Sequence, residues 1–141
     1  MNFICSDLSS LKRIAIKIID FSKECRVIIF KGEIGSGKTT LIKHILNHLN
    51  VKDLVTSPTY SIINQYETFD NDIIYHFDFF RIENEFEALE IGFNEFINSK
   101  NYCLIEWPEK IKNLLPSKFI KVNINYFEYD KRKIRITKNN F

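Results

Sequence analysis

The chain has few residues of the kinds that define specialised classes of protein. Its three cysteines, Cys5, Cys25 and Cys103, are widely spaced and form no C-x-x-C pair. This spacing predicts neither a disulfide framework nor a zinc site, and reducing cytoplasm is the simplest location. No apolar run approaches the roughly 20 residues that a membrane-spanning helix needs. No basic start followed by a long apolar run marks a signal peptide.

The chain also has little excess of either charge, because its formal net charge is only +2. Such an excess permits contact with nucleic acid but does not argue for it. Internal repeats and low-complexity linkers are absent from the sequence. A length of 141 residues with 45% hydrophobic residues predicts one domain, 1–141, with a core of ordinary size.

Glycine is scarce, yet three of the four glycines, Gly32, Gly35 and Gly37, lie within six positions. The segment 32–39 fits G-x-x-x-x-G-K-S/T at every fixed position. An apolar run at 27–30 precedes it, and a helical pattern follows it. This strand–loop–helix setting predicts a P-loop, in which main-chain N–H groups and a helix N-terminus surround phosphate. The alternative is a tight turn that binds nothing.

The P-loop pattern predicts a separate task for each polar group. Lys38 can reach the β- and γ-phosphates, and the Thr39 hydroxyl can bind Mg²⁺. We therefore expect the nucleotide contacts to come from a continuous run of residues: Glu33, Ile34, Gly35, Ser36, Gly37, Lys38, Thr39 and Thr40.

A P-loop also needs a carboxylate at the end of a neighbouring strand to hold its metal ion. Two apolar segments end in such an acid, 103–106 at Glu106 and 73–78 at Asp78. The carboxyl edge of an open α/β sheet is where ligands bind. Either acid could bind Mg²⁺ directly, bind it through water or orient the attacking water.

Three further features each allow more than one interpretation. Trp107, the only tryptophan, could be a core aromatic or an exposed ring beside the phosphates, and Pro108 disfavours a helical conformation there. Thr59, in the Ser57–Tyr60 segment, could belong to a switch that senses the γ-phosphate or to an ordinary turn. The basic hairpin around Arg132 could be solvated, contact the nucleotide or dock a partner. His76 is expected to be structural.

Hydrophobic periodicity predicts a mixed, partly parallel α/β sheet with helices on both faces and antiparallel hairpins, the P-loop NTPase-like class. Asp7 or Ser6 could cap the first helix, and Asn84 with Glu87 predicts a capping box. The expected helices are 8–21, 39–49, 85–97 and 109–115, and the expected strands are 27–30, 52–55, 61–67, 73–78, 102–105, 119–126 and 133–137.

Four motifs in this order resemble the TsaE family, also called YjeE, of small bacterial P-loop ATPases. They are the P-loop 32–40, Ser57-Pro58-Thr59-Tyr60, the segment 76–81 (HFDFFR), and 104–108 (LIEWP). The resemblance covers about residues 8–135. The SPTY and EWP segments are the more specific part, because many NTPases share the P-loop. Phe79–Phe80 stands where the family commonly has Leu-Tyr, which is a conservative difference.

This resemblance implies a cytoplasmic, Mg²⁺-dependent ATPase required for threonylcarbamoyladenosine modification of tRNA beside the anticodon. It implies the partners TsaB and TsaD, contact with tRNA only through their complex, and weak hydrolysis without them. By motif match, Lys38 binds phosphate, and Thr39 and Glu106 hold Mg²⁺. Asp78 and Trp107 are needed for hydrolysis, Thr59 belongs to a switch-like segment, and Arg132 lies near the nucleotide.

Two other functions of a P-loop remain to be weighed. A small-molecule kinase usually has an arginine-rich lid and a second substrate pocket, and no insertion of that character is present. A GTPase would need a guanine-reading Asn-Lys-x-Asp, which the sequence does not contain. The kinase is therefore the alternative to the ATPase.

Overall fold

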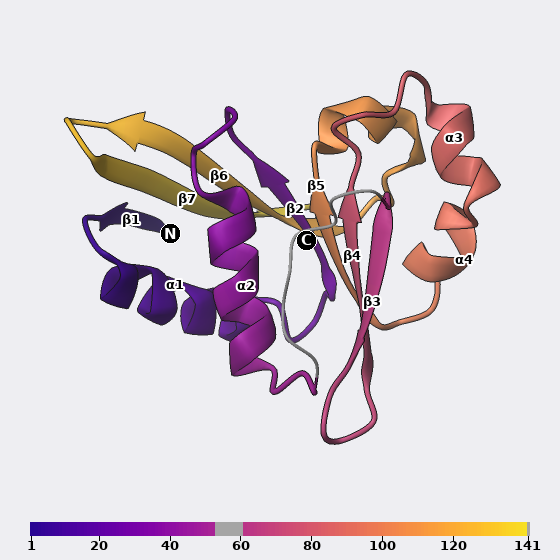
Figure 1. Cartoon of the computed structure of the whole chain (residues 1–141), viewed down its shortest axis with the longest axis horizontal. Helices are drawn as coiled ribbons and strands as arrows, with labels where there is room; N and C mark the ends of the chain where they lie inside the picture. Colours follow the sequence, from indigo (N-terminus) through magenta and orange to yellow (C-terminus); the bar gives the residue numbers. More distant parts are fainter. Residues whose placement is uncertain (53–60, 141) are drawn as a thin grey trace.

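The computed structural model describes residues 1–52 and 61–140 (Figure 1). Within them, seven strands form one sheet in the order β1-β7-β6-β2-β5-β4-β3. The strands are β1 Asn2–Cys5, β2 Val27–Lys31, β3 Ile63–Glu67, β4 Ile73–Asp78, β5 Tyr102–Glu106, β6 Phe119–Phe127 and β7 Lys131–Asn139. The helices are α1 Leu8–Phe21, α2 Lys38–His48, α3 Glu85–Glu90, α4 Phe93–Ile97 and the 3₁₀ helix η1 Pro108–Leu114.

The centre of the sheet is parallel and its edges are antiparallel. β2 pairs in parallel with β5 and β6, and β4 pairs in parallel with β5. The hairpins β3–β4 and β6–β7 are antiparallel, as is the pair β1–β7. These pairings confirm the predicted mixed, partly parallel sheet. They also place the carboxyl ends of β2, β5 and β4 along one edge, where the loop before α2 begins.

Helices cover both faces of the sheet, as predicted. α1 and α2 pack on one face through Ile14, Ile18, Leu41 and Ile45, which are all buried. α3, α4 and η1 cover the other face over β2, β5 and β4 (Figure 1), where Phe77 and neighbouring side chains form a second core cluster. Because these central strands are buried on both faces, their sequences are mainly apolar rather than alternating. No helix in the described residues is long and apolar enough to cross a membrane.

Local signals confirm several helix boundaries. The side chain of Asp7, not Ser6, caps α1 by accepting a hydrogen bond from the Ser10 amide at 2.8 Å. Asn84 and Glu87 form the predicted capping box at the start of α3.

The predicted helix 85–97 is wrong as a single element, because it divides into α3 and α4 at Gly92. The φ of Gly92 is +88°, a left-handed conformation that interrupts the helix. The short helix predicted at 109–115 is present as the 3₁₀ helix Pro108–Leu114. β1 was not predicted from its four residues, whose pairing with β7 spans nearly the whole chain. Most of the predicted strand 52–55 lies outside the described residues.

Candidate functional site

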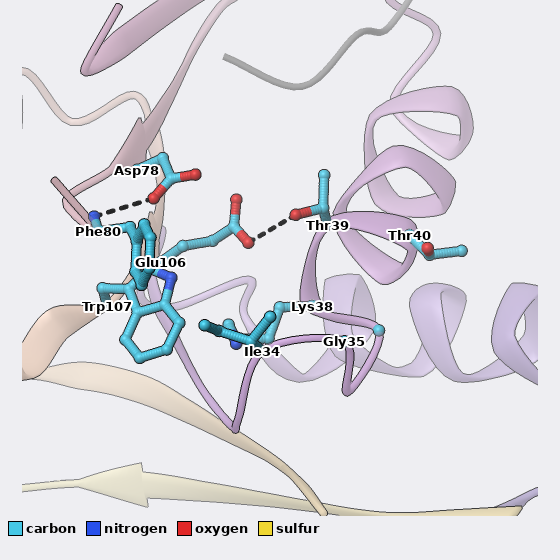
Figure 2. A pocket seen from close by; sticks show the side chains of 10 residues that line it. Ile34, Gly35, Lys38, Thr39, Thr40, Asp78, Phe80, Glu106 and Trp107 are labelled. Atoms are coloured by element: carbon cyan, nitrogen blue, oxygen red, sulfur yellow. Dashed lines mark hydrogen bonds between the residues drawn. The ribbon is translucent and has the colours of Figure 1, made fainter. Parts of the chain in front are cut away.

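A cavity of about 320 Å³ opens at the carboxyl ends of β5 and β4, between these strand ends and the loop that joins β2 to α2 (Figure 2). One wall is the loop and the first turn of α2, and the other is formed by the ends of β4 and β5. The lining residues are Ile34, Gly35, Gly37, Lys38, Thr39, Thr40, Asp78, Phe80, Glu106 and Trp107. The structure therefore brings the predicted phosphate loop and both predicted acids into one site.

The loop depends on glycine at two positions for different reasons. Gly37, immediately before α2, has a φ of +106°, a main-chain conformation that residues other than glycine rarely adopt. At Gly32, a Cβ atom would lie 2.5 Å from the main-chain oxygen of Ile124 on β6 and 2.6 Å from Ser36 Oγ. The loop therefore turns tightly against the sheet at Gly32 and enters α2 through Gly37.

Lys38 lies at the centre of the loop wall, with only 5% of its surface exposed. Its ammonium donates hydrogen bonds to the main-chain oxygens of Gly32 at 2.5 Å and Glu33 at 2.9 Å. It also lies 4.3 Å from the centre of the Trp107 ring, a cation–π contact. Burial lowers the pKa of Lys38, while the nearby carboxylates of Glu106, Glu109 and Asp78 oppose that shift. These contacts hold a positive charge at the loop where an anion would bind.

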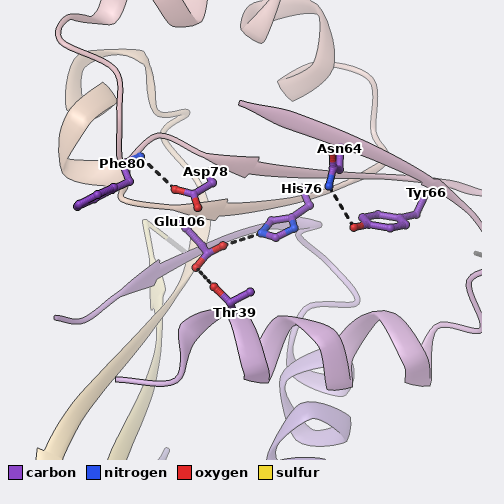
Figure 3. Close-up of polar contacts among 7 residues, drawn as sticks. All are labelled: Thr39, Asn64, Tyr66, His76, Asp78, Phe80 and Glu106. Atoms are coloured by element: carbon purple, nitrogen blue, oxygen red, sulfur yellow. Dashed lines mark hydrogen bonds and ion pairs between the residues drawn. The ribbon is translucent and has the colours of Figure 1, made fainter. Parts of the chain in front are cut away.

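The acidic wall is centred on Glu106, which is 2% exposed. Thr39 Oγ1 donates a hydrogen bond to Glu106 Oε1 at 2.8 Å, across the cavity from α2 to β5. The other carboxylate oxygen, Oε2, lies 2.7 Å from Nε2 of His76 on β4. Both oxygens of Glu106 are thus engaged (Figure 3). The Thr39–Glu106 contact joins the two residues for which a shared metal ion was predicted.

Asp78 ends β4 beside Glu106, because the two residues are register partners in the parallel pair β4–β5. Its Oδ1 accepts a hydrogen bond from the main-chain N–H of Phe80 at 3.0 Å. Burial is the main reason that the pKa of Asp78 is raised, and the charge of Glu106 adds to the shift. The carboxylate of Asp78 is therefore less solvated and more basic than a carboxylate on the surface.

These residues fit a nucleotide and a divalent cation. A hydroxyl and a carboxylate meet at Thr39 and Glu106, and such oxygen atoms are the ligands that Mg²⁺ prefers. The hydroxyl of Ser36 in the loop is buried and has no hydrogen-bond partner among the described residues. Thr39 and Glu106 would hold the metal, and Lys38 would neutralise phosphate charge beside it.

Trp107 combines features of both interpretations that its sequence position allowed. It is half-buried, packs at the edge of the second core cluster and lines the cavity. Its ring centre lies 5.0 Å from that of Phe80. Its φ of 58° and ψ of 50° are left-handed, which is costly for a bulky residue before proline. The strained main chain directs the ring toward Lys38.

Arg132 reaches the back of the loop from β7 but does not line the cavity that holds Lys38 and the two acids. Its Nε donates a hydrogen bond to the main-chain oxygen of Ser36 at 3.1 Å, and its guanidinium lies 4.2 Å from the centre of the Tyr126 ring. With Gly37 and Thr40, Arg132 lines a second cavity of about 310 Å³ against the start of α1. This space continues past the phosphate loop, where a nucleoside could extend.

Sequence reasoning missed Phe80 and Tyr126 as parts of the site. Phe80 was noticed only as a conservative change within a motif, although it lines the cavity. The Tyr126 hydroxyl donates a hydrogen bond to the Ile34 main-chain oxygen at 3.2 Å. Nothing local in the sequence distinguishes it from other aromatic strand residues. Thr59 and the rest of its segment lie outside the described residues.

Together, the mixed sheet, the glycine loop before α2 and the acids at the ends of β4 and β5 define a P-loop NTPase-like protein. The family model described as "Threonylcarbamoyl adenosine biosynthesis protein TsaE" matches residues 5–134. The chain belongs to the TsaE family, whose members take part in tRNA threonylcarbamoyladenosine biosynthesis.

Similar proteins come from several bacteria and carry the name tRNA threonylcarbamoyladenosine biosynthesis protein TsaE. The Rickettsia typhi protein is 39% identical over 82% of this chain and 79% of its own length. The Bacillus subtilis protein is 34% identical over 89% of this chain and 78% of its own. The crystal structure of Bacillus subtilis YdiB matches with a TM-score of 0.78 and 26% identity, over 99% of this chain and 84% of that one.

Proposed function

We propose that this chain, acting as one P-loop domain over residues 1–141, is a cytoplasmic Mg²⁺-dependent ATP hydrolase that serves threonylcarbamoyladenosine modification of tRNA. The observation that carries the proposal is the meeting of Lys38, Thr39 and Glu106 in one cavity. This set supplies a cation for phosphate and two oxygen ligands for a metal. The family names support the pathway.

Lys38 changes partners in the proposed mechanism. In the structure, its ammonium donates hydrogen bonds to the main-chain oxygens of Gly32 and Glu33. A phosphate oxygen carries more charge than a carbonyl oxygen, so the ammonium binds the β- and γ-phosphates in preference. The main-chain N–H groups of the loop and the N-terminus of α2 complete the phosphate site.

Thr39 and Glu106 would hold Mg²⁺, and the ion would supply positive charge to stabilise the transferred phosphoryl group. Asp78 lies beside them with a raised pKa and lines the same cavity, which supports a role in orienting the attacking water and accepting its proton. The Trp107 ring packs over Lys38 and shields this side of the cavity from bulk water.

In this proposal, the energy of ATP hydrolysis is used on partner proteins. The family names support a tRNA-modifying pathway, and the resemblance of the four motifs to the TsaE family is what points to TsaB and TsaD as the partners. Contact with tRNA is through their complex. ATP should favour this assembly more than ADP, because only ATP carries the γ-phosphate that a switch containing Thr59 would sense.

The test is threonylcarbamoyladenosine formation on tRNA by purified TsaB and TsaD, followed over many cycles with and without this protein. We expect multiple turnovers only when the protein and ATP are present, and ATP hydrolysis that rises when the partners are added. Thr59→Ala should reduce this rise more than it weakens ATP binding. Equal turnover without the protein would contradict the role, and phosphorylation of a small metabolite would favour the kinase instead.

A further inference from the structure

The carboxylate of Glu106 is held by a histidine as well as by the hydroxyl of Thr39. His76 Nε2 lies 2.7 Å from Glu106 Oε2, and the two side chains are 1% and 2% exposed (Figure 3). A buried carboxylate requires hydrogen-bond donors, since leaving it unpaired away from water is costly. His76 supplies that donor from inside the protein, on the side away from Thr39.

Sheet register explains how His76 reaches Glu106. On β4, His76 lies two residues before Asp78 and therefore on the same face of the strand. Asp78 is the register partner of Glu106 on β5, and His76 is the partner of Leu104. The Glu106 side chain leans back along the strands, so that Oε2 meets His76 while Oε1 meets Thr39 at the start of α2 (Figure 3).

The contact fits one tautomer of the ring when Glu106 acts as a metal ligand. A carboxylate that binds a metal ion is deprotonated and only accepts hydrogen bonds, so Nε2 of His76 is the donor in that arrangement. Nδ1 is buried and has no hydrogen-bond partner among the described residues. A side chain that served only to fill this part of the core would need neither nitrogen. The ring nitrogen that has a hydrogen-bond partner is therefore Nε2, which faces Glu106.

We propose that His76 is a positioning residue for the metal ligand Glu106. It keeps Oε2 occupied, so that the carboxylate presents Oε1 to Thr39 and to the cation. This inference rests on the proposed function, because it concerns the same metal ion. Hydrogen-bonded groups behind a metal ligand typically change metal affinity or activity by about 10- to 100-fold when they are replaced.

Two substitutions separate positioning from packing. His76→Gln places an amide N–H close to the position of Nε2 and keeps the donor to Glu106. His76→Asn places its amide near Nδ1 and removes that donor. Asn64→Ala is the matched control, because Asn64 is the register partner of His76 on β3 and hydrogen-bonds Tyr66 rather than Glu106.

The measurement is ADP affinity in EDTA and again in excess Mg²⁺, by titration calorimetry on the full chain. Wild type, Asn64→Ala and His76→Gln should gain affinity from Mg²⁺ to similar extents. His76→Asn should lose about 10-fold or more of that gain, with its affinity in EDTA unchanged. If His76→Asn keeps the full gain, the inference is wrong although the proposed function stands. If wild type gains nothing from Mg²⁺, both are wrong.

The wild-type protein provides a second measurement that does not depend on variants folding. A long-range ¹H–¹⁵N spectrum of the histidine ring distinguishes a protonated from an unprotonated Nε2. We expect His76 to carry a proton on Nε2. An unprotonated Nε2 would overturn the inference, because such a nitrogen cannot donate to Glu106.

Discussion

The two walls of the cavity are built in different ways. The loop wall comes from one short stretch, 32–40, and presents mainly main chain and the ammonium of Lys38. The acidic wall is assembled from side chains distant in sequence, and His76 and Glu106 are 30 residues apart. Two of the contacts described above join the walls: the hydrogen bond from Thr39 to Glu106 and the cation–π contact of Lys38 with Trp107.

This difference separates two kinds of task. A loop of this kind can surround phosphate with the main chain of one short segment. The acidic wall holds charge in a buried place, which works only when each carboxylate has donors around it. Changes to the loop wall should therefore affect nucleotide affinity most, and changes to the acidic wall should affect metal dependence and turnover most.

The largest effect is expected on the acidic wall, from Glu106→Gln. Metal ions contribute several kcal/mol of charge stabilisation in phosphoryl transfer, so ATP turnover with TsaB and TsaD should fall by about 100-fold or more. ADP binding should also lose its Mg²⁺ dependence. Asp78→Asn is the comparison: turnover should fall, but Mg²⁺ should still increase ADP affinity. Normal Mg²⁺ dependence in Glu106→Gln would show that Glu106 is not the metal ligand.

The loop wall is tested by Lys38→Ala. A charge-assisted hydrogen bond contributes about 1.5–3 kcal/mol, so ATP affinity should fall about 10- to 100-fold. Lys43→Ala is a suitable control, because it removes the same charge from the same helix at a position that lines neither cavity described above. Unchanged ATP affinity in folded Lys38→Ala, measured by calorimetry, would rule out this role for the loop.

The close approach of the loop to β6 predicts a loss of stability in Gly32→Ala. The new methyl group would meet the main-chain oxygen of Ile124 at 2.5 Å, and overpacking of this kind costs about 1–3 kcal/mol. Both the free energy of unfolding and ATP affinity should therefore fall. Gly92→Ala is also strained, at φ +88°, but it lies outside the site and should leave ATP affinity unchanged. Denaturant unfolding and calorimetry measure the two effects.

Trp107 reports on both walls, since its ring packs over Lys38 from the end of β5. When Lys38 turns to a phosphate, the surroundings of the ring change. We expect its fluorescence to change on nucleotide binding and to differ between ATP and ADP. Trp107→Phe should abolish the signal while the protein remains folded. An identical spectrum with and without saturating ATP would mean that the ring does not sense the site.

A smaller effect should appear at alkaline pH. Burial lowers the pKa of Lys38 in the free protein, and bound phosphate raises it again by favouring the charged form. ATP binding should therefore take up a fraction of a proton as pH rises toward that lowered pKa, and affinity should decline above it. Calorimetry in buffers with different ionisation enthalpies measures this uptake. In Lys38→Arg the side chain stays charged at these pH values, so ATP binding should cause no proton uptake at this position.

Much of the fold could be predicted because its signals are local. The apolar run of β2, the glycine loop and the periodic apolar positions of α2 lie side by side in the sequence, and Asp7 and Asn84 cap helices through nearby amides. Predictions were wrong where the deciding contact is distant. β1 exists because β7 offers an edge to pair with. The break at Gly92 depends on a left-handed conformation that glycine permits but does not require.

The P-loop and the two strand-end acids could be recognised in the sequence, because a P-loop is a local structure whose geometry follows from its glycines and the helix after it. The motifs that resemble the TsaE family are likewise present in the sequence. The arrangement of the acids depends on the folded sheet, because parallel pairing of β4 and β5 makes Asp78 and Glu106 neighbours. The same pairing brings His76 to Glu106, and packing turns Trp107 over Lys38. Such contacts join residues whose separation along the chain leaves no local pattern, so they exist only once the sheet has formed.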